Sequence, residues 1–112
     1  MDVTSIAGAE PFTTRDGSTI RELHHTGLQS LAEAAVSSGE ATRRHYHART
    51  EEIYFILEGE GELEIDGERR RVSPGDAALI PPGAWHEIRA SSELRFLCCC
   101  SPPYSHDDTH FE

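Results

Sequence analysis

Three histidines and one glutamate are the residues of this chain best suited to chemistry, and they lie in two glycine-containing segments. The first segment fits G-x5-H-x-H-x4-E-x6-G through Gly39, His45, His47, Glu52 and Gly59. Residues two apart on a strand point to the same face, so His45 and His47 can direct both imidazoles at one point. A carboxylate and two imidazoles turned into an apolar interior are costly to desolvate, and a shared cation removes most of that cost. The segment therefore predicts a buried group that could bind a metal.

The second segment adds one more histidine after a stiff turn. It fits G-x5-P-x-G-x2-H through Gly75, Pro81, Gly83 and His86. Proline and glycine at these positions predict a turn that leads into a strand, on which His86 shares a face with Ile88. The third imidazole can thus face the same interior as the first two.

The two patterns resemble the paired signature motifs of the cupin superfamily, which are small β-barrels with a metal site inside. The resemblance covers residues 39–90 at motif strength. It implies an all-β fold, the double-stranded β-helix or jelly-roll-like barrel. Where the family's second motif often ends in Asn, this chain has Ala90; because that Asn is not usually a ligand, the implied ligand set is unaffected. The metal ligands implied by the resemblance are His45, His47, Glu52 and His86.

This ligand set limits the metal and the chemistry. Three neutral imidazoles and a carboxylate around a divalent ion leave open coordination positions for water, O₂ or a chelating substrate. One divalent transition metal (Fe, Mn, Ni, Co, Cu or Zn) fits, and calcium and magnesium are disfavoured. The leading hypothesis is a metalloenzyme that acts on a small oxygen-rich molecule, as a dioxygenase or as an isomerase or decarboxylase. The alternative is a non-catalytic module that binds or senses a small ligand.

Two further residues are candidates for contact with a substrate. Arg43 lies two residues before His45, so strand parity predicts that it points toward the same cavity, where a guanidinium could pair with a carboxylate or phosphate. An ion pair with a surface acid is the competing interpretation. Tyr54 shares a face with Glu52 and could hydrogen-bond a substrate, or it could fill the barrel as a structural aromatic residue.

Composition excludes several classes of partner. The 112-residue chain has a formal net charge of −10 and contains no lysine, so its few basic residues are arginines. Nucleic acid and anionic membranes are therefore not expected partners, and no stretch is apolar and long enough to span a bilayer. Its cysteines are consecutive, at Cys98, Cys99 and Cys100, which cannot form a disulfide framework and suits the cytoplasm.

Turn signals recur at short intervals and predict many short strands. Strands are expected at 18–23 and 94–100, and at 28–36, where a helix is the competing interpretation. Asp66-Gly67 between alternating residues predicts a hairpin with a type I′ turn. Such spacing is typical of a sandwich or barrel.

A single domain is expected over residues 1–112. Its core barrel should span about 18–100, with an N-terminal arm at 1–17 and a C-terminal tail at 101–112. The tail contains His106, Asp107, Asp108 and His110, which either form a second metal site or belong to a solvated, partly ordered segment that crosses the barrel or touches a partner subunit. The open edge of the strand at 18–23 predicts a homodimer.

Overall fold

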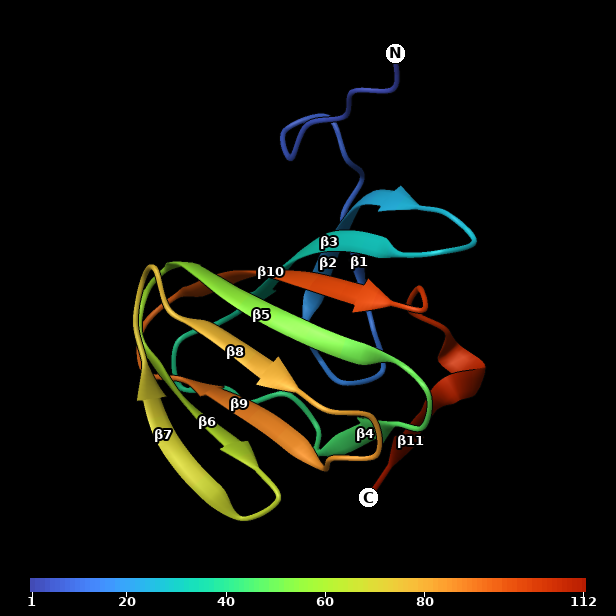
Figure 1. Ribbon diagram of the computed structural model, residues 1–112. Coiled ribbons are helices and arrows are strands. Elements are labelled where there is room, and N and C mark those ends of the chain that lie inside the picture. The colour runs from blue at the N-terminus through green and yellow to red at the C-terminus, as the bar shows by residue number, and fades with distance from the viewer.

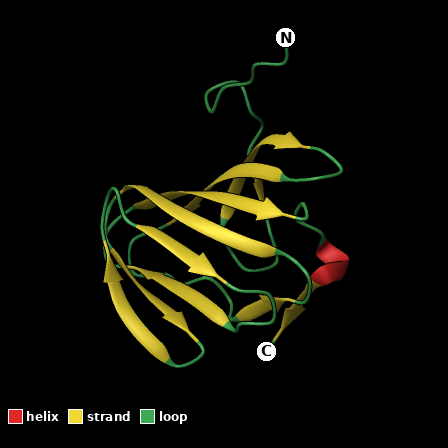
Figure 2. Cartoon of the chain, viewed as in Figure 1, coloured by secondary structure: helices red, strands yellow, loops and turns green.

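Two antiparallel β-sheets, facing each other, make up this molecule in the computed structural model, which describes residues 1–112 (Figure 1). The larger sheet has six strands in the order β1-β2-β3-β10-β5-β8, and the smaller has five in the order β11-β4-β9-β6-β7. A single turn of 3₁₀ helix, His106–Asp108, is the only helical element (Figure 2). No helix of the structure is long and apolar enough to cross a membrane. The all-β, jelly-roll-like fold is thus confirmed. The strands are β1 (Phe12–Thr13), β2 (Thr19–His25), β3 (Ser30–Val36), β4 (His45–His47), β5 (Glu51–Glu58), β6 (Gly61–Ile65), β7 (Glu68–Val72), β8 (Ala77–Ile80), β9 (His86–Ala90), β10 (Leu94–Ser101) and β11 (Thr109–Phe111).

Local sequence signals account for most of these strands. Residues 30–36 form strand β3, not a helix, because they pair with β2 on one side and β10 on the other. The β6–β7 hairpin turns at Asp66 and Gly67, both of which have positive φ angles (48° and 88°), as a type I′ turn requires. In β5 every second residue from Glu52 to Ile56 is buried, which confirms that Glu52, Tyr54 and Ile56 share the inward face.

The space between the sheets is filled mainly by apolar side chains. Burying each of the larger ones contributes about 1.5–3 kcal/mol. The barrel closes tightly near Gly59, where a Cβ atom would lie 1.9 Å from the carbonyl oxygen of Glu93 and where φ is +81°. Only glycine fits there, which explains the glycine that ends the first motif. The buried apolar cluster consists of Ala34, Val36, Tyr54, Ile56, Leu63, Val72, Ile80, Ala84, Ile88, Ala90, Leu94 and Phe96.

Both sheets extend beyond the expected core range of 18–100. Strand β1 pairs with β2 at the N-terminal side, and β11 pairs with β4 across Thr109–His47 and Phe111–His45. The tail is therefore more ordered than the sequence suggested, since it supplies an edge strand to the five-stranded sheet. By contrast, the first residues of the N-terminal arm project away from the barrel (Figure 1), and Val3 is 77% exposed.

Candidate metal centre

The predicted metal-binding residues come from both sheets and meet between them. Strand β4 presents His45 and His47, and β9 presents His86 directly opposite His45 in the antiparallel register. Glu52 enters from β5 of the six-stranded sheet. All four side chains are buried, with exposed fractions of 4% or less.

The three imidazoles form one tight cluster. One ring nitrogen from each lies within 4.8 Å of the ring nitrogens of the other two. The ring centroids of His45 and His86 are 4.3 Å apart, and those of His45 and His47 are 5.1 Å apart. Three nitrogen atoms at such spacing could hold one metal ion.

A hydrogen bond at Nδ1 fixes the orientation and the tautomer of each imidazole ring. His45 Nδ1 donates to the carbonyl oxygen of Arg43 (2.7 Å), and His86 Nδ1 donates to that of Ala84 (3.0 Å). His47 Nδ1 lies 3.0 Å from the hydroxyl of Thr109, whose own proton is given to the carbonyl of Ser105 (2.8 Å). The hydroxyl must therefore accept the His47 proton. In each ring Nδ1 carries the proton, which leaves the Nε2 lone pair free, the arrangement by which proteins orient metal-binding histidines.

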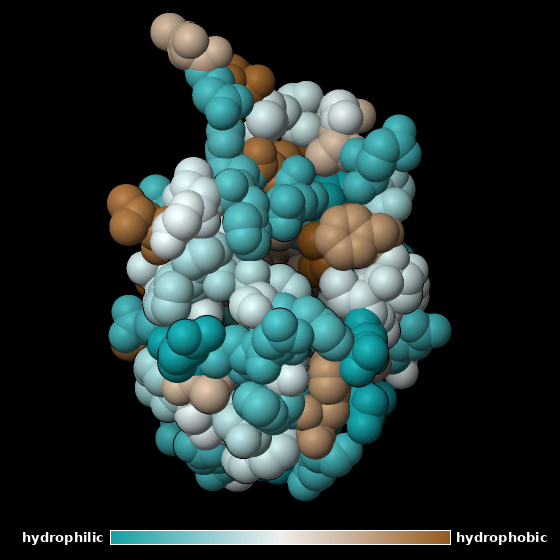
Figure 3. Space-filling view, turned by 90° about the vertical axis from the view of Figure 1, so that its right-hand side faces the viewer, coloured by the Kyte–Doolittle hydropathy of each residue, from teal (hydrophilic) through white to brown (hydrophobic).

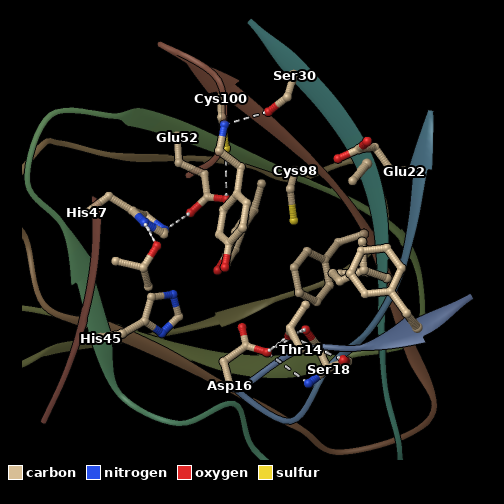
Figure 4. Close-up of a pocket in the computed structure, with 18 of the residues that line it drawn as sticks. Thr14, Asp16, Ser18, Glu22, Ser30, His45, His47, Glu52, Cys98 and Cys100 are labelled. Atoms are coloured by element: carbon tan, nitrogen blue, oxygen red, sulfur yellow. Dashed lines mark hydrogen bonds and ion pairs between the residues drawn. The ribbon is translucent and has the colours of Figure 1, made fainter. Parts of the chain in front are cut away.

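Glu52 completes the cluster on one side. Its Oε1 lies 3.2 Å from His47 Nε2 and 3.5 Å from His86 Nε2. Yet Oε1 and His86 Nε2 are both buried and have no hydrogen-bond partner. Because both imidazole nitrogens carry lone pairs, the carboxylate faces acceptors with no proton between them, which is unfavourable unless a cation lies there. The donor set thus fits a divalent metal, although Glu52 contacts only two of the three histidines; Figure 4 shows its contact with His47.

Protonation states agree with this chemistry. Burial, together with the neighbouring His86, lowers the pKa of His45 to about 4, so its imidazole is neutral at pH 7. Burial raises the pKa of Glu52, but the hydrogen bonds and positive charge that His47 and His86 would supply in their protonated forms lower it by more, so the net pKa lies below its ordinary value. A neutral His45 imidazole and an ionised Glu52 carboxylate are the forms that bind metal.

A cavity of about 70 Å³ opens beside the cluster. Its lining includes His45, His47 and Glu52, and the surface is hollowed on one face of the molecule (Figure 3). Tyr54 also lines it, and burial followed by the charge of Glu52 raises the tyrosine's pKa well above its usual value. Tyr54 therefore stays protonated and can donate a hydrogen bond to a ligand.

Arg43 does not take the predicted position. It is exposed, donates to the main-chain oxygen of Glu112 (3.2 Å), and lies 4.7 Å from the ring centre of Phe111. The parity argument was wrong because residues 42–44 precede β4 and are not in strand conformation. No arginine lines the cavity.

Two residues of the site were missed by the sequence analysis. Thr109 orients His47 from the C-terminal strand, and Asp16 lines the cavity from the loop before β2. Neither has a local signal, because Thr109 reaches the site through the pairing of β11 with β4 and Asp16 through a main-chain hydrogen bond with Arg43 (2.7 Å). The tail residues suggested as a second metal site do not cluster, since Asp108 is buried against the N–H groups of Arg49 and Thr50.

Comparison with known proteins gives concordant matches. The family described as "Cupin domain" matches residues 32–100. The uncharacterized protein MJ1618 of Methanocaldococcus jannaschii is 48% identical over 107 residues, which cover 89% of this chain and 86% of that protein. The L-ectoine synthase of Hahella chejuensis is 37% identical over 70 residues, or 61% of this chain and 52% of the enzyme. This chain therefore matches only about half the length of that enzyme.

Solved structures agree in fold. KdgF from Halomonas sp. has a TM-score of 0.84 at 24% identity and covers 96% of both chains. The Streptomyces nucleoside dehydratase Pac13 has a TM-score of 0.83 at 13% identity, over 96% of this chain and 88% of the other. At these identities the likeness concerns the fold alone.

Proposed function

This chain belongs to the cupin family, and from that premise we propose that it is a mononuclear metalloenzyme that acts on a small molecule bound in the cavity. The proposed metal ligands are His45, His47, Glu52 and His86, and the metal is one divalent transition ion. The observation that carries this proposal is the buried Glu52 Oε1 beside His86 Nε2, two atoms that lack hydrogen-bond partners.

A bound metal would supply Lewis-acid polarisation of a substrate oxygen. The side chains of the chain itself perform the remaining tasks. Tyr54 offers a proton donor at the cavity, and the flanking apolar residues exclude water, which strengthens hydrogen bonds made inside. The hydroxyl of Thr109 holds His47 in orientation.

Redox-neutral chemistry is the better supported of the two reaction types. Several curated relatives of the chain are L-ectoine synthases, including that of Wolinella succinogenes at 31% identity, and a protein of the same fold is a nucleoside dehydratase. A dehydratase removes water without a net change in oxidation state. We therefore place isomerisation, dehydration or decarboxylation ahead of dioxygenation.

Elemental analysis of the purified protein tests the metal proposal. We expect close to one transition metal ion per chain, and His86→Ala should remove most of it. His106→Ala is the matched control, because this histidine is exposed and lies outside the cluster. Full metal occupancy in the His86 variant would contradict the assignment.

Product analysis then separates an enzyme from a binding module. Protein loaded with Mn, Fe, Co, Ni or Zn is incubated with sugars, uronates, amino acids, nucleosides and keto acids, and products are followed by NMR. Product formation by the wild-type protein that is lost in Glu52→Gln would support the proposal that the protein is an enzyme. Tight binding without turnover with every metal would instead favour a sensor. Consumption of O₂ would favour the dioxygenase over redox-neutral chemistry.

We also propose that the chain forms a homodimer in the cytoplasm. Strand β2 meets β1 only at Thr19 and Ile20, so the rest of its outer edge pairs with no strand, although the Thr4 hydroxyl donates to the carbonyl oxygen of Leu23 (3.0 Å). The outer face of the same sheet exposes Ile53, Phe55 and Leu79, and pairing of two copies would cover such surfaces. The free thiols at 98–100 agree with a reducing compartment. Light scattering that gives the monomer mass at micromolar concentration would rule out the dimer.

A further inference from the structure

We infer that the cavity selects a ligand with a positively charged amine, carried on the same short molecule as the oxygens that chelate the metal. This inference rests on the proposed function, since it names the substrate class of the same site. It replaces the anionic substrate that Arg43 suggested from the sequence.

The charges around the cavity all have one sign. Three carboxylates line it, those of Asp16, Glu22 and Glu52, and no arginine does. The chain has no lysine. Of the two acids away from the metal cluster, Glu22 is exposed, whereas Asp16 is partly buried. Outside the metal cluster, a ligand carboxylate or phosphate would therefore be repelled and would find no cationic side chain among the lining residues, whereas an ammonium would meet an unneutralised carboxylate.

Asp16 is held rigidly, and half of its carboxylate is left unused. Its Oδ1 accepts hydrogen bonds from the main-chain N–H of Ser18 (2.9 Å), the hydroxyl of Ser18 (2.6 Å) and the hydroxyl of Thr14 (2.5 Å). The other oxygen makes no hydrogen bond or ion pair with the protein, and it points into the cavity (Figure 4). A carboxylate fixed on one side and free on the other is pre-organised for a cationic donor.

Aromatic rings supply the second element of an ammonium site. Besides Phe111, whose ring already has the Arg43 guanidinium 4.7 Å from its centre, four aromatic residues line the cavity: Phe12, Tyr54, Phe96 and Tyr104. Ring faces attract cations, and aromatic rings combined with carboxylates are the usual means of binding amines and substituted ammonium groups. Asp16 lies beside His45 in the close-up (Figure 4), and its free oxygen faces the same cavity. The ligand is therefore a short molecule that carries an amine a few atoms away from its chelating oxygens.

Three matched hydroxamates test this inference. 3-Aminopropanohydroxamate, butanohydroxamate and succinomonohydroxamate share the metal-chelating group and nearly the same length, and differ in whether the far end is ammonium, methyl or carboxylate. Binding to zinc-loaded protein is measured by titration calorimetry. We expect the ammonium probe to bind about 10- to 100-fold more tightly than the methyl probe, the range of a hydrogen bond to a charged partner, and the carboxylate probe to bind most weakly.

In Asp16→Asn, the affinity for the ammonium probe should fall close to the affinity for the methyl probe. The affinity for butanohydroxamate itself should stay unchanged, because the asparagine oxygen can still accept hydrogen bonds from Thr14 and Ser18. Glu68→Gln removes the same charge from an exposed strand outside this cavity and should keep the wild-type ratio. Equal affinities in the wild-type protein, or a preference for the carboxylate probe, would overturn the inference.

Failure of the metal proposal can be recognised separately, because the protein would then contain no zinc by elemental analysis. In that case propylammonium and propionate are compared by thermal shift on the metal-free protein. Stabilisation by the cation that Asp16→Asn removes supports the inference, and its absence overturns it.

Discussion

The two ends of the barrel interior differ in chemistry although the same strands build both. Along β5 the inward residues run from Glu52 through Tyr54 to Ile56, and along β9 from His86 to Ile88. At one end polar atoms are buried without partners, and at the other Ile56 and Ile88 are 1% exposed or less. The apolar end stabilises the fold. That stability offsets the cost of burying polar atoms at the other end, which lack hydrogen-bond partners until a ligand binds.

The apolar end should respond most strongly to truncation. Ile88→Ala should lower the free energy of unfolding by about 2–5 kcal/mol, because it removes a fully buried side chain and leaves a cavity. Urea denaturation measures the change. Leu28→Ala, at a position 80% exposed in the turn between β2 and β3, is the control and should change stability by no more than about 0.5 kcal/mol. Equal effects of the two variants would contradict the contrast between core and surface.

The polar end should respond in metal affinity more than in stability. Thr109→Val keeps the shape of the side chain but removes the acceptor of the His47 Nδ1 proton. We expect metal affinity to fall about 10- to 100-fold, measured by competition with a chromophoric chelator. Thr109→Ser retains the hydroxyl and should retain affinity. If the valine variant binds as tightly as the wild type, Thr109 does not position the histidine.

The smallest effect should come from Asp108, which fastens the tail beside the metal end. Burial raises the pKa of its carboxyl, but hydrogen bonds from the N–H groups of Arg49 and Thr50 lower it by more, so the net pKa lies below the ordinary value of 3.8. A lowered folded-state pKa contributes stability that is present above the unfolded value and is lost as pH falls through the folded value.

Unfolding free energies measured between about pH 2 and pH 6 should therefore show an acid-dependent loss. Asp108→Asn should remove that component and cost about 1 kcal/mol at neutral pH. Asp107→Asn, at an exposed neighbouring position, should leave the profile unchanged. An unaltered profile in the Asp108 variant would mean that this carboxylate does not tie down the tail.

Much of the fold was predictable because it follows from local patterns. The predicted shared faces of Glu52 with Tyr54 and of His86 with Ile88 were correct. The Asp66-Gly67 turn marked its hairpin, and the strand at 30–36 was correctly preferred to a helix. The clustering of His45, His47 and His86 also follows the predicted spacing. These features depend on side-chain periodicity and turn conformation, which neighbouring residues determine.

What the sequence by itself determined is the set of inward-facing residues on each strand, and with it the histidine cluster. Only the tertiary structure decided which other residues lie beside that cluster. It directed Arg43 outward, because the parity of β4 does not extend into residues 42–44, and it brought Asp16 into the cavity and Thr109 to His47. The physical reason is that periodicity fixes a residue's face, whereas long-range strand pairing fixes its neighbours, and 62 positions separate His47 from Thr109.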